Sequence, residues 1–83
     1  MQANEESVIK RIEKDITMFN DAVKTLKLDE TELVKVVEMS KLYALDSKSY
    51  LDKGDLFTSF SCISYAHGLL DAVRSIKGLI LKD

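Results

Sequence analysis

Hydrophobic and polar positions follow a helical period along most of the chain. In the first third, apolar side chains recur at Ile12, Ile16 and Phe19, three or four positions apart, which is the spacing of an apolar stripe on one face of an amphipathic helix. Asn4 precedes this stripe, and an asparagine side chain can accept a hydrogen bond from a free N–H group of the first helical turn. The pattern predicts a helix over residues 5–27.

A second stripe begins at Leu33 and mixes large apolar residues with serine and alanine. Asp29 and Glu32, three positions apart, approximate a capping box, in which two side chains satisfy N–H groups at the start of a helix. Gly54 ends the stripe, because glycine readily adopts the left-handed backbone conformation that closes many helices. The pattern predicts a helix over residues 30–53.

The third stripe starts directly after that glycine, with Asp55 as its N-cap, and predicts a helix over residues 55–77. A link as short as Gly54-Asp55 requires the helices on either side to be antiparallel neighbours. Amphipathic helices of this length bury their apolar faces against one another. We therefore expect residues 1–83 to form one all-α domain, an antiparallel three-helix bundle with a tight hairpin between its second and third helices.

Small residues dominate the predicted contact between the second and third helices. In an antiparallel hairpin, facing residues have numbers that add to a constant, here about 108, because both helices rise equally per residue. This register places Tyr43 opposite Tyr65 and elsewhere pairs small residues, so that the helix axes can approach closely. The predicted close-packing ridge comprises Ser40, Ala44 and Ser47 of the second helix and Ser61, Ser64, Gly68 and Ala72 of the third.

The third helix is apolar on almost every side, which favours complete burial. Two neighbouring helices cover only part of its circumference, so we expect one flank to remain for a protein partner or for a second copy of the chain. The segment Leu79-Ile80-Leu81 adds further apolar residues. The candidate interface comprises Leu56, Phe60, Ile63 and Leu70.

Polar residues of the second and third helices form a candidate functional cluster. One interpretation is structural, in which Asp71 accepts a hydrogen bond from His67 one turn away and tyrosine hydroxyls bond to carboxylates at the edge of the core. The other interpretation is a pocket for a small ligand, a metal or a reaction, around Tyr43, Asp46, His67 and Asp71. The whole cluster comprises Tyr43, Asp46, Tyr50, Tyr65, His67 and Asp71.

The chemical inventory of this cluster is sparse. Ser64, His67 and Asp71 share one side of a helix, but a serine in mid-helix has no free N–H groups beside it to stabilise an oxyanion. A single histidine and the lone Cys62 make a poor set of metal ligands. We therefore expect no catalytic residues, no resident metal and no cofactor, and a protein that is not an enzyme.

Composition indicates the setting in which the protein works. Apolar residues make up 46% of the chain, enough for a packed core, and the formal net charge is −2, whereas nucleic-acid-binding domains usually carry a basic surplus. An unpaired cysteine is typical of a reducing compartment, and no apolar run reaches the length of a membrane span. We expect a cytoplasmic protein that binds neither membranes nor nucleic acid.

The second and third helices also carry a recognisable motif, which resembles the signature of the DUF357 family of short archaeal proteins. The resemblance covers roughly residues 37–79, and it implies an archaeal, cytosolic, helical protein with no assigned activity. It transfers no catalytic residue, because none is established for that family. The residues that carry it are Tyr43, Asp46-Ser47, Tyr50, Gly54-Asp55, Ser64-Tyr65-Ala66-His67-Gly68 and Leu70-Asp71-Ala72.

A looser similarity is to helical HEPN domains, some of which cleave RNA with an arginine placed several residues before a histidine. Residues 60–66, which precede His67, contain no arginine. An RNA-associated domain of this type would therefore lack its catalytic arginine. The hypothesis that the sequence favours is an uncharacterised, non-enzymatic interaction module that self-associates through its third helix.

Overall fold

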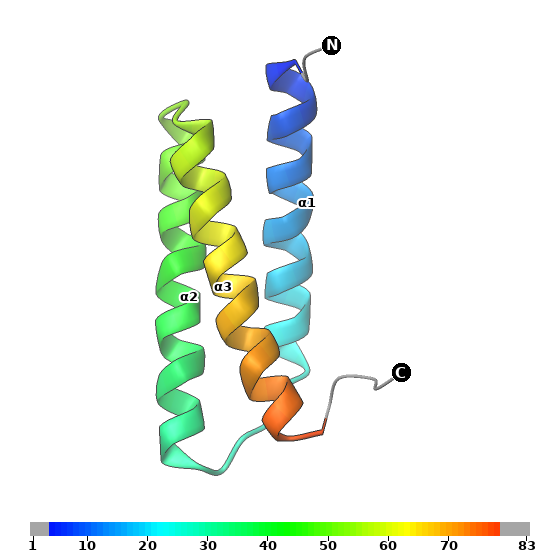
Figure 1. Cartoon of the computed structure of the whole chain (residues 1–83), viewed down its shortest axis with the longest axis vertical. Coiled ribbons are helices and arrows are strands. Elements are labelled where there is room, and N and C mark those ends of the chain that lie inside the picture. Colours follow the sequence, from blue (N-terminus) through cyan, green and yellow to red (C-terminus); the bar gives the residue numbers. More distant parts are fainter. Residues whose placement is uncertain (1–3, 79–83) are drawn as a thin grey trace.

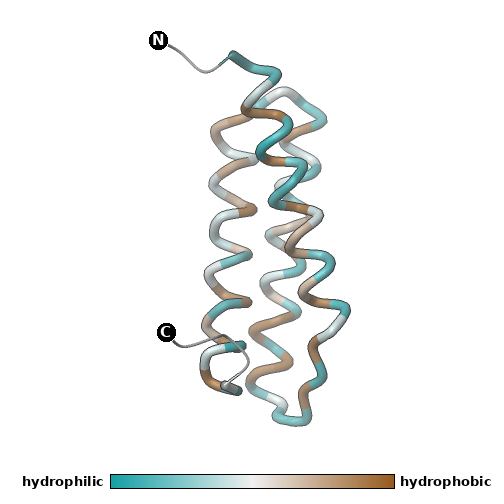
Figure 2. Tube along the Cα trace, turned by 90° about the vertical axis from the view of Figure 1, so that its right-hand side faces the viewer, coloured by the Kyte–Doolittle hydropathy of each residue, from teal (hydrophilic) through white to brown (hydrophobic). Residues whose placement is uncertain are grey.

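The computed structural model describes residues 4–78, and the Leu79-Ile80-Leu81 segment lies outside the described residues. Three antiparallel helices follow one another, α1 (Glu5–Lys24), α2 (Thr31–Asp52) and α3 (Leu56–Ile76), and in Figure 1 they run down, up and down. Apolar and polar residues alternate along all three (Figure 2). The all-α three-helix bundle predicted from the sequence is confirmed, and α2 and α3 form its most extensive contact.

The predicted caps at the starts of α1 and α3 are present. The backbone N–H of Ser7 donates to Asn4 Oδ1 at 2.7 Å, and the N–H of Thr58 donates to Asp55 Oδ1 at 3.1 Å. Gly54 closes α2 with a φ of +84°, in the left-handed region that side chains disfavour. The turn between α2 and α3 is thus built as the Gly54-Asp55 pattern predicts.

The connection between α1 and α2 differs from the prediction. α1 ends at Lys24 rather than at residue 27, because the hydroxyl and the backbone N–H of Thr25 both donate to the carbonyl of Ala22. The expected capping box is wrong, since Glu30 is the N-cap of α2 and makes no side-chain cap bond. Its carboxylate instead accepts from Lys77 Nζ at 2.8 Å, which lowers the pKa of Glu30 and ties the start of α2 to the end of α3.

The core lies where α1 and α2 pack against α3. Ile63, Ala66 and Leu70 of α3 are fully buried, and Phe19 of α1 belongs to the same cluster. Ile12 of α1 is also fully buried. The small residues predicted to line the contact on α2 are buried as well, namely Ser40, Ala44 and Ser47. Ser47 bonds to Ser59 and so faces α3, whereas Ala44 also lines the space between α2 and α1.

The part of the ridge predicted on α3 is wrong. Ser47 faces Ser59, and their hydroxyls lie 3.1 Å apart, so the register is shifted by two residues from the predicted pairing with Ser61. Successive residues of a helix are rotated by about 100° about its axis. A register shift of two residues therefore rotates the side of α3 that faces α2 by roughly 200°. The residues expected in the seam are consequently exposed on the outer face of α3: Ser61, Ser64, Gly68 and Ala72.

Candidate functional site

His67 lies between α3 and α1 and takes part in a structural contact. Its Nε2 lies 2.8 Å from the backbone carbonyl oxygen of Asp15, and because a carbonyl only accepts, Nε2 carries the proton and donates. The ring also meets the edge of Phe19, with centroids 5.7 Å apart and an interplanar angle of 85°. His67 therefore joins the two helices through its side chain.

Asp71, which was expected to accept a hydrogen bond from His67, makes a different contact. It is exposed, and its Oδ1 lies 3.7 Å from Nη1 of Arg74 one turn away. Asp46 of α2 is exposed too. The predicted hydrogen bond between His67 and Asp71 is wrong.

The tyrosines of the predicted cluster lie along the contact between α2 and α3. Tyr43 and Tyr65 meet edge to face with centroids 4.6 Å apart. Their side chains make contact as expected, although the Ser47–Ser59 register places Ile63 rather than Tyr65 opposite Tyr43. With Ser61 and Cys62 they line a shallow hollow of 350 Å³. Tyr50 lies elsewhere, with Lys53 Nζ 5.3 Å from its ring centroid. The pKa of the Cys62 thiol is raised, mainly by burial and to a smaller extent by the negative charges of Asp46 and Asp55.

The six residues of the predicted cluster thus lie in separate places. His67 faces α1, the Tyr43–Tyr65 pair faces outward along the α2–α3 contact, and Asp71 is in solvent beside Arg74. Within residues 4–78, no three histidine, cysteine or acidic side chains lie close enough together to hold a metal ion. These residues therefore do not form the shared pocket that was one of the two interpretations of the sequence.

The flank of α3 proposed as an interface is the flank that α1 covers. Ile63 and Leu70 have exposed fractions of 0%, and the guanidinium of Arg11 lies over the ring of Phe60 at 5.8 Å. Leu56 is half-buried and Phe60 remains 38% exposed. The expectation that this flank is free is therefore wrong for Ile63 and Leu70, whereas Phe60 stays partly exposed beside α1.

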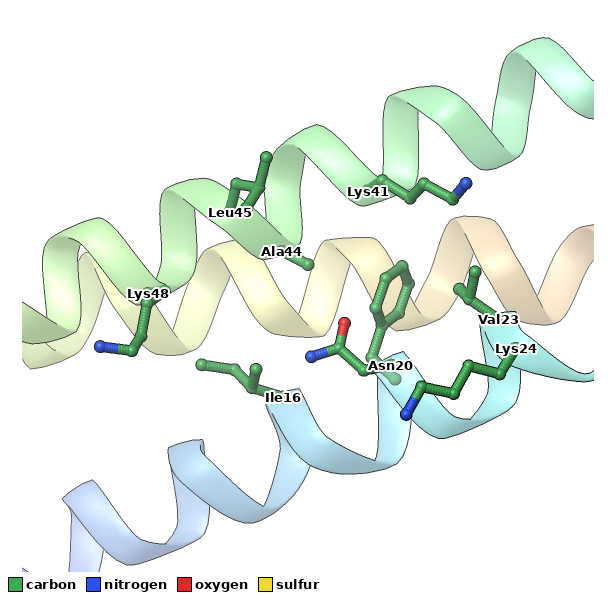
Figure 3. Close-up of a pocket in the computed structure, with 9 residues that line it drawn as sticks. Ile16, Asn20, Val23, Lys24, Lys41, Ala44, Leu45 and Lys48 are labelled. Carbon is green, nitrogen blue, oxygen red and sulfur yellow. The ribbon is translucent and has the colours of Figure 1, made fainter.

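An open groove runs instead between α1 and α2. Figure 3 shows side chains of the two helices facing each other across it, with α3 behind. Its volume is 590 Å³, and its floor is largely apolar. We call it the α1–α2 groove, and it is lined by Ile16, Phe19, Asn20, Val23 and Lys24 of α1 and by Lys41, Ala44, Leu45 and Lys48 of α2.

A second hollow extends the α1–α2 groove toward the loop that joins the two helices. It has a volume of 200 Å³ and shares Val23 and Lys41 with the first. On α2, the lining therefore reaches from Val34 to Lys48, which corresponds to about 21 Å at a rise of about 1.5 Å per helical residue. The remaining lining residues of this hollow are Leu26, Leu28, Val37 and Glu38.

Lysines dominate the charged residues of the α1–α2 groove. Lys24 comes from α1, and Lys41 and Lys48 come from α2, two turns apart on one side of that helix. Lys41 bonds to Glu38 at 3.1 Å and Lys48 to Asp52 at 2.8 Å, each within its own helix. Lys24 makes no ion pair with any of residues 4–78. The residues that line the groove and its extension thus include three lysines and one glutamate, and Lys41 and Lys48 are already paired within α2.

Sequence reasoning missed the α1–α2 groove because it looked for surplus apolar residues on α3. A signal was present on α2, whose large apolar residues extend beyond the stripe that faces the core. Leu45 is 66% exposed at the rim of the groove, and Val34 is 37% exposed. Met39 and Leu42 of the same helix are also exposed. Only Leu45 and Val34 of these residues line the groove or its extension, so exposed apolar residues on α2 indicate a binding surface without fixing its side.

Comparison with known proteins identifies a family. Residues 9–79 match the family described as "Protein of unknown function (DUF357)", so the match includes all of α2 and α3 and most of α1. No curated protein matches the chain. No helix among residues 4–78 is both long and apolar enough to cross a membrane.

Proposed function

The chain belongs to the DUF357 family of proteins of unknown function, and on that premise we propose that it is a non-enzymatic helical module that binds another protein in the α1–α2 groove. The observation that carries this proposal is the groove itself, an apolar surface open to solvent between two helices. Binding a partner there would remove Leu45, Val23 and Ile16 from water. Such burial is the main favourable contribution in most protein association.

The form of the groove supports a protein ligand over a small molecule. Small-molecule sites are concave cavities that enclose most of their ligand and hold a few convergent polar groups. The α1–α2 groove is elongated and open, and Asn20 is its one uncharged polar side chain. An extended row of side chains from a partner fits this shape better than a compact ligand does.

The contacts of the polar residues support a non-enzymatic role. Nε2 of His67 donates to the carbonyl of Asp15, and the imidazole packs edge to face against Phe19. Asp46 and Asp71 are exposed and lie apart from the histidine. A general acid or base must instead lie within hydrogen-bond reach of a bound substrate.

Two exposed leucines of α2 provide a matched test. Leu45 lines the α1–α2 groove and Leu42 does not, although their exposed fractions are close, at 66% and 62%. Partners are captured from extracts of the source organism with the wild-type chain and with Leu45→Glu or Leu42→Glu, and the affinity of the purified partner is then measured for each. We expect Leu45→Glu to weaken binding by at least about tenfold and Leu42→Glu to have little effect.

Both variants should fold, because neither leucine belongs to the core. Circular dichroism and urea unfolding of each variant verify this before binding is compared. A partner that binds Leu45→Glu as tightly as the wild-type chain, or that loses affinity equally with both variants, would overturn the assignment of binding to the groove.

A further inference from the structure

The chemistry of the α1–α2 groove points to a specific kind of partner. We infer that the groove takes an acidic amphipathic α-helix of about four turns from another protein, which lies along it as the fourth helix of a bundle. This inference rests on the proposed function and adds the class of partner to it.

The backbone on both sides of the groove explains why the partner segment is helical. Both edges are α-helices, whose N–H and C=O groups bond within their own helix. An extended peptide that adds to a β-sheet needs free backbone donors and acceptors along an edge, and these two helices offer none along the groove. Only side chains are available for recognition, and a helix presents its apolar side chains in one row at matching intervals.

The length of the groove sets the length of the partner helix. The lining of α2 runs from Val34 to Lys48, and a helix lying beside it over the same distance has about 14 residues, or roughly four turns. Its lining includes the buried Phe19 of α1 and Ala44 of α2, which form its floor. The ribbon of α3 lies behind the groove (Figure 3). A fourth helix at this position completes an arrangement that helical bundles commonly adopt.

The charges on the rim explain why the partner is acidic. Lys24 lies on one side of the groove and Lys41 and Lys48 lie on the other, so a helix in the groove has ammonium groups along both of its flanks. Glu38 is the only acidic residue among the lining residues. Lys41 bonds to Glu38 and Lys48 to Asp52, but both pairs are exposed and lie within one helix. Such pairs are weak, so both ammonium groups stay available to carboxylates of a partner. Glutamates or aspartates on both sides of an apolar stripe would therefore meet complementary charge, which increases the association rate and selects the partner.

The same charges argue against a second copy of this chain as the occupant. In a two-fold symmetric dimer each surface meets its own copy, so the three lysines of one groove would face the same three of the other. Juxtaposed like charges oppose association. The occupant is therefore a different protein.

Two synthetic peptides test the inference directly. Both are 15-residue helical peptides with the same leucine stripe at helical spacing, and they carry either glutamates or lysines on the flanks of that stripe. Fluorescence anisotropy measures the affinity of each labelled peptide for the full chain. We expect the glutamate peptide to bind at least about tenfold more tightly than the lysine peptide, and we expect added salt to weaken that binding.

Charge-reversed variants test whether the preference for the glutamate peptide arises from the lysines of the groove. The triple variant Lys24→Glu/Lys41→Glu/Lys48→Glu should reverse the preference so that the lysine peptide binds more tightly. The control replaces three exposed lysines that do not line the groove, Lys10→Glu/Lys14→Glu/Lys35→Glu, and it should keep the preference of the wild-type chain. The control also matches the change in net charge, so a reversal seen with both variants would overturn the inference.

Failure of this inference is distinguishable from failure of the proposed function. If Leu45→Glu abolishes binding of the captured partner but the wild-type chain does not prefer the glutamate peptide, the groove binds a protein but the acidic helix is wrong. A wild-type dimer in sedimentation equilibrium that becomes monomeric with Leu45→Glu would assign the groove to a second copy and would also overturn the inference.

Discussion

Ser47 and Ser59 exchange hydrogen bonds across the contact between α2 and α3. Each hydroxyl donates to the backbone carbonyl of the other residue at 2.7 Å, and both side chains are completely buried. Small side chains at this position let the helix axes approach closely, and the reciprocal bonds satisfy the hydroxyls that this close approach removes from water. The pair fixes the register of the hairpin near the Gly54 turn.

Removing either hydroxyl should destabilise the protein modestly, and enlarging the side chain should destabilise it more. We expect Ser47→Ala or Ser59→Ala to lower the free energy of unfolding by about 1 kcal/mol. Ser47→Leu should lower it by about 3 kcal/mol, because the added carbons force the helices apart. Urea unfolding measures both effects. Ser49→Leu, on the exposed side of α2, is the control, and a loss of stability as large as that of Ser47→Leu would contradict the register.

Replacing Gly68 should stabilise the protein. Gly68 is exposed within α3, and an added Cβ would meet nothing within 4 Å. Alanine loses less backbone entropy than glycine when a helix forms, so Gly68→Ala should raise the free energy of unfolding by about 0.5–1 kcal/mol. If Gly68→Ala instead lowers the thermal midpoint, Gly68 lies in a packed seam, as the sequence predicted.

Replacing Gly54 with alanine should have the opposite effect on stability to replacing Gly68. An added Cβ at Gly54 would also meet nothing within 4 Å, but its φ is +84°. An alanine in the left-handed conformation costs about 1–2 kcal/mol, so Gly54→Ala should lower the free energy of unfolding by that amount. Thermal and urea unfolding of the two alanine variants should therefore give shifts of opposite sign. A Gly54→Ala variant as stable as the wild-type chain would contradict the conformation of the turn.

His67 should contribute to stability through α1 and not through Asp71. Because its hydrogen bond to the Asp15 carbonyl joins two helices, His67→Ala should lower the free energy of unfolding by about 1 kcal/mol. Asp71→Asn, at an exposed position, should change it by less than about 0.5 kcal/mol. The double variant should equal the sum of the two, and a strongly non-additive result would show that His67 and Asp71 interact after all.

The Cys62 thiol should react slowly in the folded protein. Burial first, and then the negative charges of Asp46 and Asp55, raise its pKa, and the reactive species is the thiolate. Alkylation by iodoacetamide near pH 8.5 should therefore be slower in the native chain than in urea. Asp46→Asn should increase the native rate, because it removes one of the opposing charges.

The raised pKa of the Cys62 thiol also predicts that the stability of the protein depends on pH. The folded chain holds the thiol proton more tightly than the unfolded chain does, so unfolding releases protons above the pKa of the unfolded thiol. The free energy of unfolding should then fall as pH rises through the window between the unfolded and folded pKa values. Cys62→Ser should remove this part of the pH dependence, and an unchanged profile in that variant would contradict the assignment.

The fold could be predicted from sequence because its signals are local. Asn4 and Asp55 cap helices through bonds to residues only three positions away, and Gly54 closes α2 through its own backbone. The register of α2 against α3 is not local. It depends on how the Gly54-Asp55 turn directs the chain, and an offset of two residues was enough to exchange the inner and outer faces of α3 while leaving Ser47 correctly buried.

The candidate site was harder to predict for the same reason. Spacing along one helix put His67 beside Asp71, but the direction of the imidazole depends on α1, whose position nothing in the sequence specifies. Once α1 covers Ile63 and Leu70, the side that remains open is the one between α1 and α2. Leu45 then becomes a candidate binding residue, which the sequence of α2 alone could not distinguish from the equally exposed Leu42.

The attachment of α1 has a consequence for the order in which the bundle opens. α1 contributes two fully buried residues, Ile12 and Phe19, whereas α2 and α3 hold the remaining core between them. Such an element can separate as a cooperative unit at a lower free energy than global unfolding. Backbone amides of α1 should then exchange with deuterium sooner than those of the hairpin. A protein bound in the α1–α2 groove would slow that exchange by holding α1 against α2.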